Sequence, residues 1–205
     1  MRIFSLQGSL GEPSRTACLV ALAERVLRHL GADVETTDLR RVRIPTVDPR
    51  LHDAGAHPDP EVRSLLDSAA SADAFLWASP VYHNSYSGIL KNALDHLTIG
   101  HVAHKPVALC ANGGRQGSTQ PTDHLRIVAR GLHGVAIPHV LVSRNDAFSI
   151  SEGAYRIADR AVVTRMVTLC QQLVDYAHAL ASLRDPAAQP VSSSPSTAPN
   201  ESAAG

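Results

Sequence analysis

Three short segments of this sequence combine polar side chains with glycines at spacings that suit ligand binding. The first, GSLGEPSRT, occupies residues 8–16 and offers three hydroxyl groups, from Ser9, Ser14 and Thr16. Its glycines let backbone amides approach a ligand, and a helix starting after it would add free N–H groups and a positive dipole end. We therefore predict a phosphate site here. A capping loop is the alternative, because Ser14 would also make a good N-cap.

The second segment, SPVYHNSYSG, follows an apolar run and occupies residues 79–88. Pro80 lacks an N–H and restricts the backbone, so we expect the amides of residues 81–85 to face a neighbouring planar group. Tyr82 and Tyr86 could stack on that group or close its edge. Three further side chains could reach polar heteroatoms: His83, Asn84 and Ser85. An exposed polar turn is the alternative.

The third segment, ANGGRQGST, occupies residues 111–119. Gly113 and Gly114 permit close backbone approach, and Arg115 places a cation beside them, although a simple glycine turn is the alternative. Together the three segments suit a flat heterocycle on a phosphorylated chain, and FMN fits better than ATP. The first segment has neither the Gly-Lys-Ser/Thr of a P-loop nor GxGxxG, which counts against nucleotide hydrolysis and a standard dinucleotide site.

Short apolar runs that alternate with helical patterns would position these segments. The apolar runs predict strands at residues 2–8, 33–39, 73–80, 106–114 and 135–143. Recurrence at three and four residues predicts helices at residues 14–31, 58–72, 89–97, 120–133 and 153–183. Successive βα units imply a parallel sheet with helices on both faces. Ligands bind such sheets at the carboxyl ends of the strands, and all three segments follow strands.

Composition narrows the function classes. The chain has 205 residues, 44% of them hydrophobic, which suits one domain with a single core. Its 19 basic and 19 acidic residues balance, which argues against nucleic-acid and membrane partners. We find no signal peptide or membrane span and expect a soluble cytoplasmic protein. We expect residues 1–183 to form one domain and the Pro- and Ser-rich residues 184–205 to be a disordered tail.

Several other residues that could do chemistry are predicted to have structural roles instead. Three well-separated cysteines lack CxxC spacing and are predicted to be reduced core side chains: Cys18, Cys110 and Cys170. His96, His101 and His104 have no cysteine pair near them, so we predict a solvated helix end rather than a zinc site. Lys91 and Asp95 are spaced for a helix-face ion pair.

An arginine-rich loop is predicted at residues 40–58. A compact domain seldom carries a loop of roughly twenty residues without using it. Arg40, Arg41 or Arg43 could bind the phosphate of NADPH, because guanidinium groups suit phosphate oxygens. A plain exposed loop is the alternative.

The binding segments resemble those of the NAD(P)H-dependent FMN reductase family, a branch of the flavodoxin-like fold. Gly8-Ser9, Ser14-x-Thr16, residues 79–95 and Gly113-Gly114 carry the resemblance. Residues 79–95 are similar to the family's P-x-Y-x-x-S-x-x-G-x-L-K-N-x-x-D signature, which is highly specific. The resemblance covers roughly residues 1–180. It implies an α/β fold, a doubly wound five-stranded parallel sheet in the order 2-1-3-4-5.

The resemblance also implies which residues hold FMN. Those of the first segment would bind its phosphate, with Arg15 nearby. Residues 80–85 would line the isoalloxazine ring, with amides facing its N5, O4 and N3 edge, and the glycines of the third segment would approach its pyrimidine side. The full set is Ser9, Ser14, Arg15, Thr16, Pro80, Val81, Tyr82, His83, Asn84, Ser85, Gly113, Gly114 and Arg115. No residue receives a catalytic or metal-binding role.

The implied activity is NAD(P)H-dependent FMN reduction. NADPH or NADH would deliver hydride to flavin N5, and free flavin, a quinone, an azo compound or a metal ion would accept the electrons, with ping-pong kinetics. The leading interpretation is a homodimeric or homotetrameric reductase that supplies reduced flavin to a partner monooxygenase. A quinone or azo reductase with tightly bound FMN, a flavodoxin-like electron carrier and a flavin-binding protein without turnover are the alternatives. The balanced charge counts against the carrier, since flavodoxins are usually acidic.

The chain departs from the sulfonate-utilisation type of FMN reductase at one place. That type has an aromatic insertion in the helix after the glycine loop, whereas residues 121–134 have none and place His124 there. Shuttling of flavin as a substrate is tied to that insertion. We therefore expect FMN to be retained as a prosthetic group.

Overall fold

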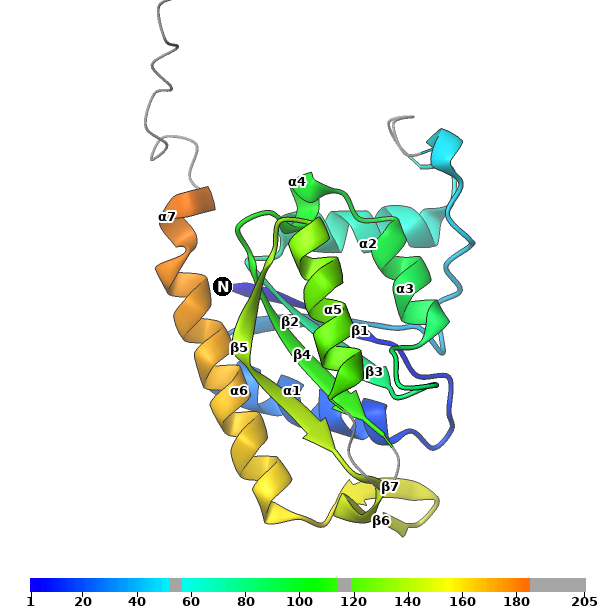
Figure 1. Ribbon diagram of the computed structural model, residues 1–205, viewed down its shortest axis with the longest axis vertical. Helices are drawn as coiled ribbons and strands as arrows, with labels where there is room; N and C mark the ends of the chain where they lie inside the picture. The colour runs from blue at the N-terminus through cyan, green and yellow to red at the C-terminus, as the bar shows by residue number, and fades with distance from the viewer. Residues whose placement is uncertain (52–56, 114–118, 185–205) are drawn as a thin grey trace, which may run out of the picture.

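A parallel sheet of five strands forms the centre of the fold (Figure 1). The computed structural model describes residues 1–51, 57–113 and 119–184. The strands are β1 (Arg2–Gln7), β2 (Asp33–Asp38), β3 (Ala74–Pro80), β4 (Pro106–Asn112) and β5 (Val135–Ser143). They lie in the order β2-β1-β3-β4-β5, with parallel pairing throughout. The fold class and the strand order predicted from the sequence are confirmed.

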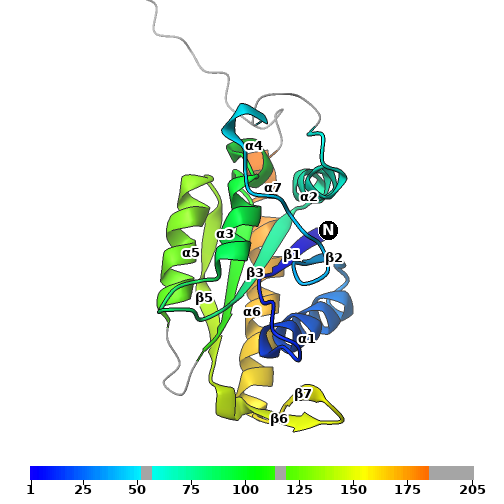
Figure 2. The same cartoon turned by 90° about the vertical axis from the view of Figure 1, so that its right-hand side faces the viewer.

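Helices cover both faces of the sheet. One face is covered by α1 (Arg15–His29) and α6 (Arg160–Ala179). The other is covered by α2 (Pro60–Ser71), α3 (Gly88–Asp95) and α5 (Gln120–Gly131). Figure 2 shows α1 and α5 on opposite sides of the sheet. The shorter elements are α4 (Ile99–Val102), α7 (Ala181–Arg184) and 3-10 turns at Pro49–Leu51 and Asn145–Ala147.

Alternation along the strands supplies two separate cores. Ile3 and Leu76 belong to the core beneath α1 and α6, whereas Phe4, Phe75 and Trp77 belong to the core on the opposite face. Successive side chains of a strand point to opposite faces, so a strand covered on both sides is apolar along its length. All 7 residues of β3 are buried accordingly. This packed sheet fixes the strand ends from which the functional loops leave.

The structure corrects the predicted helix over residues 153–183 at its start. A two-stranded antiparallel sheet lies there, formed by β6 (Phe148–Ser151) and β7 (Ala154–Ile157), and only after it does α6 begin. The turn between the strands has positive φ angles at Glu152 and Gly153, as two-residue hairpins of this kind require. The hairpin escaped prediction because Glu152 is not a residue that usually marks such a turn.

The other predicted elements agree with the structure to within two residues at each end. The predicted loop at residues 40–58 contains a 3-10 turn in its described part, and residues 52–56 lie outside the described residues. Residues 185–205 of the predicted tail also lie outside them, whereas Arg184 belongs to α7. Within the described ranges, no helix is both long and apolar enough to cross a membrane.

Candidate functional site

The first loop, residues 8–14, leaves β1 at the carboxyl edge of the sheet, the edge at which β1 to β5 end. Gly8 donates its amide proton to Ala78 O at 2.8 Å, and its carbonyl accepts the hydroxyl proton of Ser87. A Cβ at position 8 would lie 2.8 Å from Leu90 Cβ, so glycine is required by close packing. The first loop is therefore fixed directly beside the loop that follows β3.

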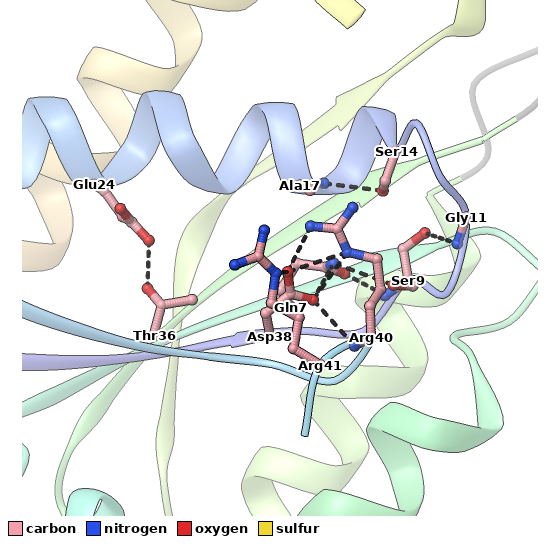
Figure 3. Close-up of polar contacts among 10 residues, drawn as sticks. All are labelled: Gln7, Ser9, Gly11, Ser14, Ala17, Glu24, Thr36, Asp38, Arg40 and Arg41. Atoms are coloured by element: carbon pink, nitrogen blue, oxygen red, sulfur yellow. Dashed lines mark hydrogen bonds and ion pairs between the residues drawn. The ribbon is translucent and has the colours of Figure 1, made fainter. Parts of the chain in front are cut away.

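Gln7, the last residue of β1, holds the first loop in shape (Figure 3). Its side-chain oxygen accepts the amide proton of Ser9, and its Nε2 donates to Ser9 O at 3.1 Å. Nε2 also donates to Asp38 Oδ1 at 2.9 Å, across the β1–β2 pair. The side chain is buried, and these bonds satisfy it. The sequence did not single out this residue; the available signal was a glutamine at the end of an apolar strand.

Asp38 in turn holds Arg40 through both carboxylate oxygens. Arg40 Nε lies 3.0 Å from one oxygen and 3.1 Å from the other, and a terminal guanidinium nitrogen also donates. Burial alone would raise the pKa of Asp38, but the hydrogen bonds from Arg40 outweigh it and hold that pKa below its ordinary value. The charge of Arg40 is thus largely compensated, which disfavours it as a partner for NADPH. Arg41 and Arg43 are exposed, and each is still a candidate for binding the phosphate of NADPH.

The start of α1 presents donors without acceptors. Ser14 caps the helix by accepting from Ala17 N at 3.1 Å, so the predicted N-cap is confirmed. In the described part of the chain, the amides of Arg15 and Thr16 have no acceptor. Capping leaves the hydroxyl proton of Ser14 free to donate as well. An anion placed here would satisfy these donors at the positive end of the helix dipole.

Arg15 adds a buried donor without a partner. Its guanidinium carbon lies 4.1 Å from the centroid of the Tyr155 ring, which belongs to β7. Its Nε is buried and, within the described residues, has no hydrogen-bond partner. Leaving a buried charged donor unpaired is costly, so the position calls for an anionic acceptor. The residues at the start of α1 therefore fit the phosphate of FMN.

The second loop, residues 81–87, contains a tight turn and uses three of its amides in bonds to backbone carbonyls. The ends of the turn Tyr82–Ser85 exchange both backbone hydrogen bonds at 2.9 Å, and Val81 N donates to the last residue of β4 at 2.8 Å. His83 and Asn84 form the tip, with φ angles of 50° and 62°. This corrects the expectation that all amides of residues 81–85 face a ligand. Of the five amides of residues 81–85, only those of His83 and Asn84 lack an acceptor among the described residues.

A histidine from α5 braces the second loop. Ser85 Oγ lies 3.0 Å from His124 Nδ1, and the His124 ring meets Tyr86 edge-on with 6.4 Å between centroids. Pro80 is buried at the end of β3, and Tyr82 is 49% exposed beyond it. His124 stood out in the sequence only because an insertion was absent, and its contact with the second loop could not be foreseen.

Gly113, the first residue of the third loop (residues 113–119), packs against the second loop. Its amide donates to Ser143 O of β5 at 3.1 Å, and a Cβ at this position would lie 1.9 Å from Val81 Cγ2. Packing against Val81 therefore explains why this residue is glycine. Gly114 and Arg115, also predicted to bind FMN, lie outside the described residues.

The three cysteines were predicted to be core side chains, and this prediction is confirmed for two of them. Cys110 and Cys170 are buried, Cys18 is partly exposed, and all three are free. Burial raises the pKa of Cys170 to about 12, which keeps it a neutral thiol. Among the described residues, no group of three His, Cys, Asp or Glu side chains could hold a metal ion.

Of two predictions about α3 and the residue that follows it, one is confirmed and the other is wrong. Lys91 and Asp95 form the predicted ion pair along the helix. His96, predicted to be solvated, is buried instead. Its Nε2 lies 2.9 Å from Pro45 O, which pairs the ring and fixes the long loop after β2.

Comparison with known proteins bears on this site. A sequence model of the family described as NADPH-dependent FMN reductase matches residues 1–148. The chain is 39% identical over 116 residues to a Staphylococcus saprophyticus protein named FMN-dependent NADPH-azoreductase, and the match covers 56% of this chain. It spans 62% of the length of that protein.

Solved structures agree on the fold. The flavoenzyme NAD(P)H:(acceptor) oxidoreductase FerB from Paracoccus denitrificans is similar with a TM-score of 0.69 and 22% identity, over 87% of this chain and 97% of that one. A flavodoxin from the domain Archaea is similar with a TM-score of 0.61 and 10% identity, over 87% of this chain and 99% of that one. At these identities the likeness shows a flavodoxin-like fold.

Proposed function

The chain belongs to the NADPH-dependent FMN reductase family, and from this premise we propose that it binds FMN at the carboxyl edge and uses NAD(P)H to reduce a small-molecule acceptor. FMN, when bound, supplies the redox chemistry, so the chain has to bind the cofactor, orient it and shape its surroundings. The proposed site lies beside β1 and β3, where the strand order reverses, as expected for sheets of this topology.

The observation that carries this proposal is the group of unpaired donors at the start of α1. The amides of Arg15 and Thr16 and the Nε of Arg15 point to an anionic ligand that the described chain does not itself provide. The hydroxyls of Ser9 and Ser14 would complete a phosphate site. The bonds of Gln7 to the first loop hold it in shape before the ligand arrives, which lowers the entropy cost of binding.

The second loop supplies the other contacts. The free amides of His83 and Asn84 would donate to the polar edge of the flavin ring, in place of the longer run of amides expected from the sequence. The contact between Ser85 and His124 keeps this turn in place. The packing of Gly113 on Val81 fixes the spacing between the second and third loops.

An azo compound is the acceptor that we propose first. The support comes from the staphylococcal relatives, whose names describe FMN-dependent NADPH-azoreductases. Free flavin, passed on in reduced form to a monooxygenase, is the second candidate, and the description of the family supports it. The monooxygenase partner and the homodimer or homotetramer remain predictions from resemblance.

The test begins with the purified protein. We expect a yellow protein whose FMN oxidises NADPH and whose rate with an azo dye exceeds its rate with free FMN. A faster rate with free FMN would favour the second candidate. A colourless protein that does not bind added FMN and consumes no NADPH in its presence would remove the proposal.

A variant at the start of α1 ties that result to the site. Thr16→Val keeps the shape of a buried side chain and removes its hydroxyl. We expect roughly tenfold weaker FMN binding, the usual loss for one hydrogen bond to a charged group. Thr168→Val, on the exposed part of α6, is the matched control and should leave FMN binding unchanged. Equal FMN affinity in both variants would exclude Thr16 as a ligand.

A further inference from the structure

The β6–β7 hairpin docks onto the start of α1. Cys18 Sγ lies 3.3 Å from Tyr155 O, and the ring of Phe148 meets that of Tyr155 edge-on with 6.3 Å between centroids. The chain after the hairpin is anchored too, because the amides of Ala158 and Asp159 both donate to the carbonyl of Ala147, the residue before β6. Figure 1 shows the hairpin beside α1 at the end of β5. Tyr155 is thus held by contacts with α1 and with β6.

Tyr155 fixes the side chain of Arg15. The guanidinium lies 4.1 Å above the ring centroid, within the range of a cation–π contact. Arg15 is the first residue of α1 and follows the first loop directly in the chain. Its buried Nε has no partner within the described residues, although its position is fixed. An immobilised, unpaired guanidinium suits an incoming phosphate.

Arg40 has no comparable capacity. It lies at the same edge, but Asp38 holds its guanidinium through both carboxylate oxygens. No carboxylate pairs with Arg15 among the residues that the structure describes. Of these two cations, Arg15 is the one that can still accept an anion.

The hairpin and the first loop also face a common hollow. A cavity of about 670 Å³ is lined by Pro13 and Ser14 from the first loop and by Gly153–Ile157 from the hairpin. The hairpin therefore forms one wall of a hollow that begins at the start of α1.

We propose that Tyr155 is a positioning residue that sets the preference of this site for FMN over riboflavin. Its ring holds Arg15 where the guanidinium meets the phosphate, and riboflavin lacks that phosphate. The isoalloxazine ring is the same in both flavins, so the contribution of Arg15 falls on FMN alone. Without the ring, Arg15 would lose rotamer freedom only when FMN binds, which weakens the contact. This inference rests on the proposed function and names a determinant of that site.

The test measures the dissociation constants of FMN and riboflavin by quenching of flavin fluorescence. We expect Tyr155→Leu to weaken FMN binding roughly threefold to thirtyfold, the range for losing a cation–π contact, and to leave riboflavin binding unchanged. Tyr155→Phe keeps the ring and should keep the preference for FMN. Arg15→Gln should weaken FMN binding at least as much, and adding Tyr155→Leu to it should change the preference no further.

Tyr176→Leu is the matched control, because it makes the same substitution at a partly buried tyrosine of α6, outside the hairpin and the first loop. It should keep the ratio of the two affinities even if it lowers the melting temperature of the apoprotein. Equal losses for FMN and riboflavin in Tyr155→Leu would overturn the inference and leave the ring a docking role only. A Tyr155→Phe protein that behaves like Tyr155→Leu would also overturn it. A wild-type protein that binds neither flavin would instead remove the proposed function itself.

Discussion

Two cations that lie over aromatic rings at opposite edges of the sheet differ in their acceptors. Lys105 precedes β4 at the amino edge, with its Nζ 5.7 Å from the centroid of Phe75. It donates to the carbonyls of Ala69 and Ala70, both at 3.0 Å, near the end of α2. Arg15 lies over its ring at the carboxyl edge, and its buried Nε has no acceptor within the described residues. The chain completes the first site by itself and leaves the second incomplete.

The difference separates stability from binding. A buried cation with its hydrogen bonds made supports the fold, and removing it leaves acceptors unpaired. A buried donor without an acceptor opposes folding until a ligand supplies one, and the free energy of ligand binding then adds to stability. We therefore expect changes at the amino edge to lower the free energy of unfolding of the apoprotein. Changes at the carboxyl edge should act on FMN affinity, except where a residue also packs loops against each other or caps a helix.

That exception gives the largest expected effect. Gly113→Ala would place a Cβ 1.9 Å from Val81 Cγ2, which forces the second and third loops apart. We expect a loss of about 2–4 kcal/mol in the free energy of unfolding, together with weaker FMN binding, because the overpacked loops have to move. Urea unfolding of the apoprotein and an FMN titration would measure both.

Gly131→Ala is the control for that change. A Cβ at position 131 meets nothing within 4 Å, and the residue ends α5. Alanine there should be neutral or slightly stabilising. If Gly113→Ala lowered FMN affinity and left stability unchanged, packing would not be the reason for this glycine, and direct approach to the ligand would explain it better.

The second prediction tests the amino edge. Lys105→Met keeps the aliphatic stem but leaves the carbonyls of Ala69 and Ala70 without their donor. We expect a loss of about 1–3 kcal/mol in the free energy of unfolding and no change in the dissociation constant of FMN. Lys91→Met is the matched control, because Lys91 forms a partly exposed ion pair with Asp95 of the kind that contributes about 0–1 kcal/mol. A change in FMN affinity in Lys105→Met would contradict the separation of the two edges.

The apolar runs predicted the strands, because each leads to a helix and so specifies a βα unit, and the resemblance to the family implied their order. Prediction from the sequence failed where the contacts depend on register or on a rare backbone. Gln7 meets Asp38 only because these residues are paired across β1 and β2. The turn in the second loop has positive φ angles at His83 and Asn84, residues that tolerate this conformation without predicting it.

The candidate site was predicted to the level of its loops. Ser14, Arg15 and Thr16 lie at the start of α1 as expected, because a polar loop before a periodic segment marks a helix start. Tyr155 was missed, since GAYRIAD continues the helical spacing of α6 and its role arises only when the hairpin folds back onto α1. Tyr155 is distant from α1 in the sequence, and no local pattern predicts the contact between them.

The buried lysine of the amino edge also makes the stability of the protein depend on pH. Burial lowers the pKa of Lys105 from 10.5 to about 8. Between these values the unfolded chain binds more protons than the folded chain, so the free energy of unfolding rises with pH through this window. We expect the difference in stability between wild type and Lys105→Met to grow by about 2–3 kcal/mol from pH 7.5 to pH 10.5. A constant difference would show that the lysine is not desolvated in the folded protein.

The smallest expected effect distinguishes two roles of one residue. Ser14 caps α1, and Asp59 caps α2 by accepting from Glu61 N at 2.8 Å. Replacing either by alanine removes a cap and should lower the free energy of unfolding by about 1 kcal/mol. Only Ser14→Ala should also weaken FMN binding, because only that cap lies among the unpaired donors of the carboxyl edge. If both variants lost stability and neither lost FMN affinity, Ser14 would be a cap alone, and the phosphate would depend on the amides and Arg15.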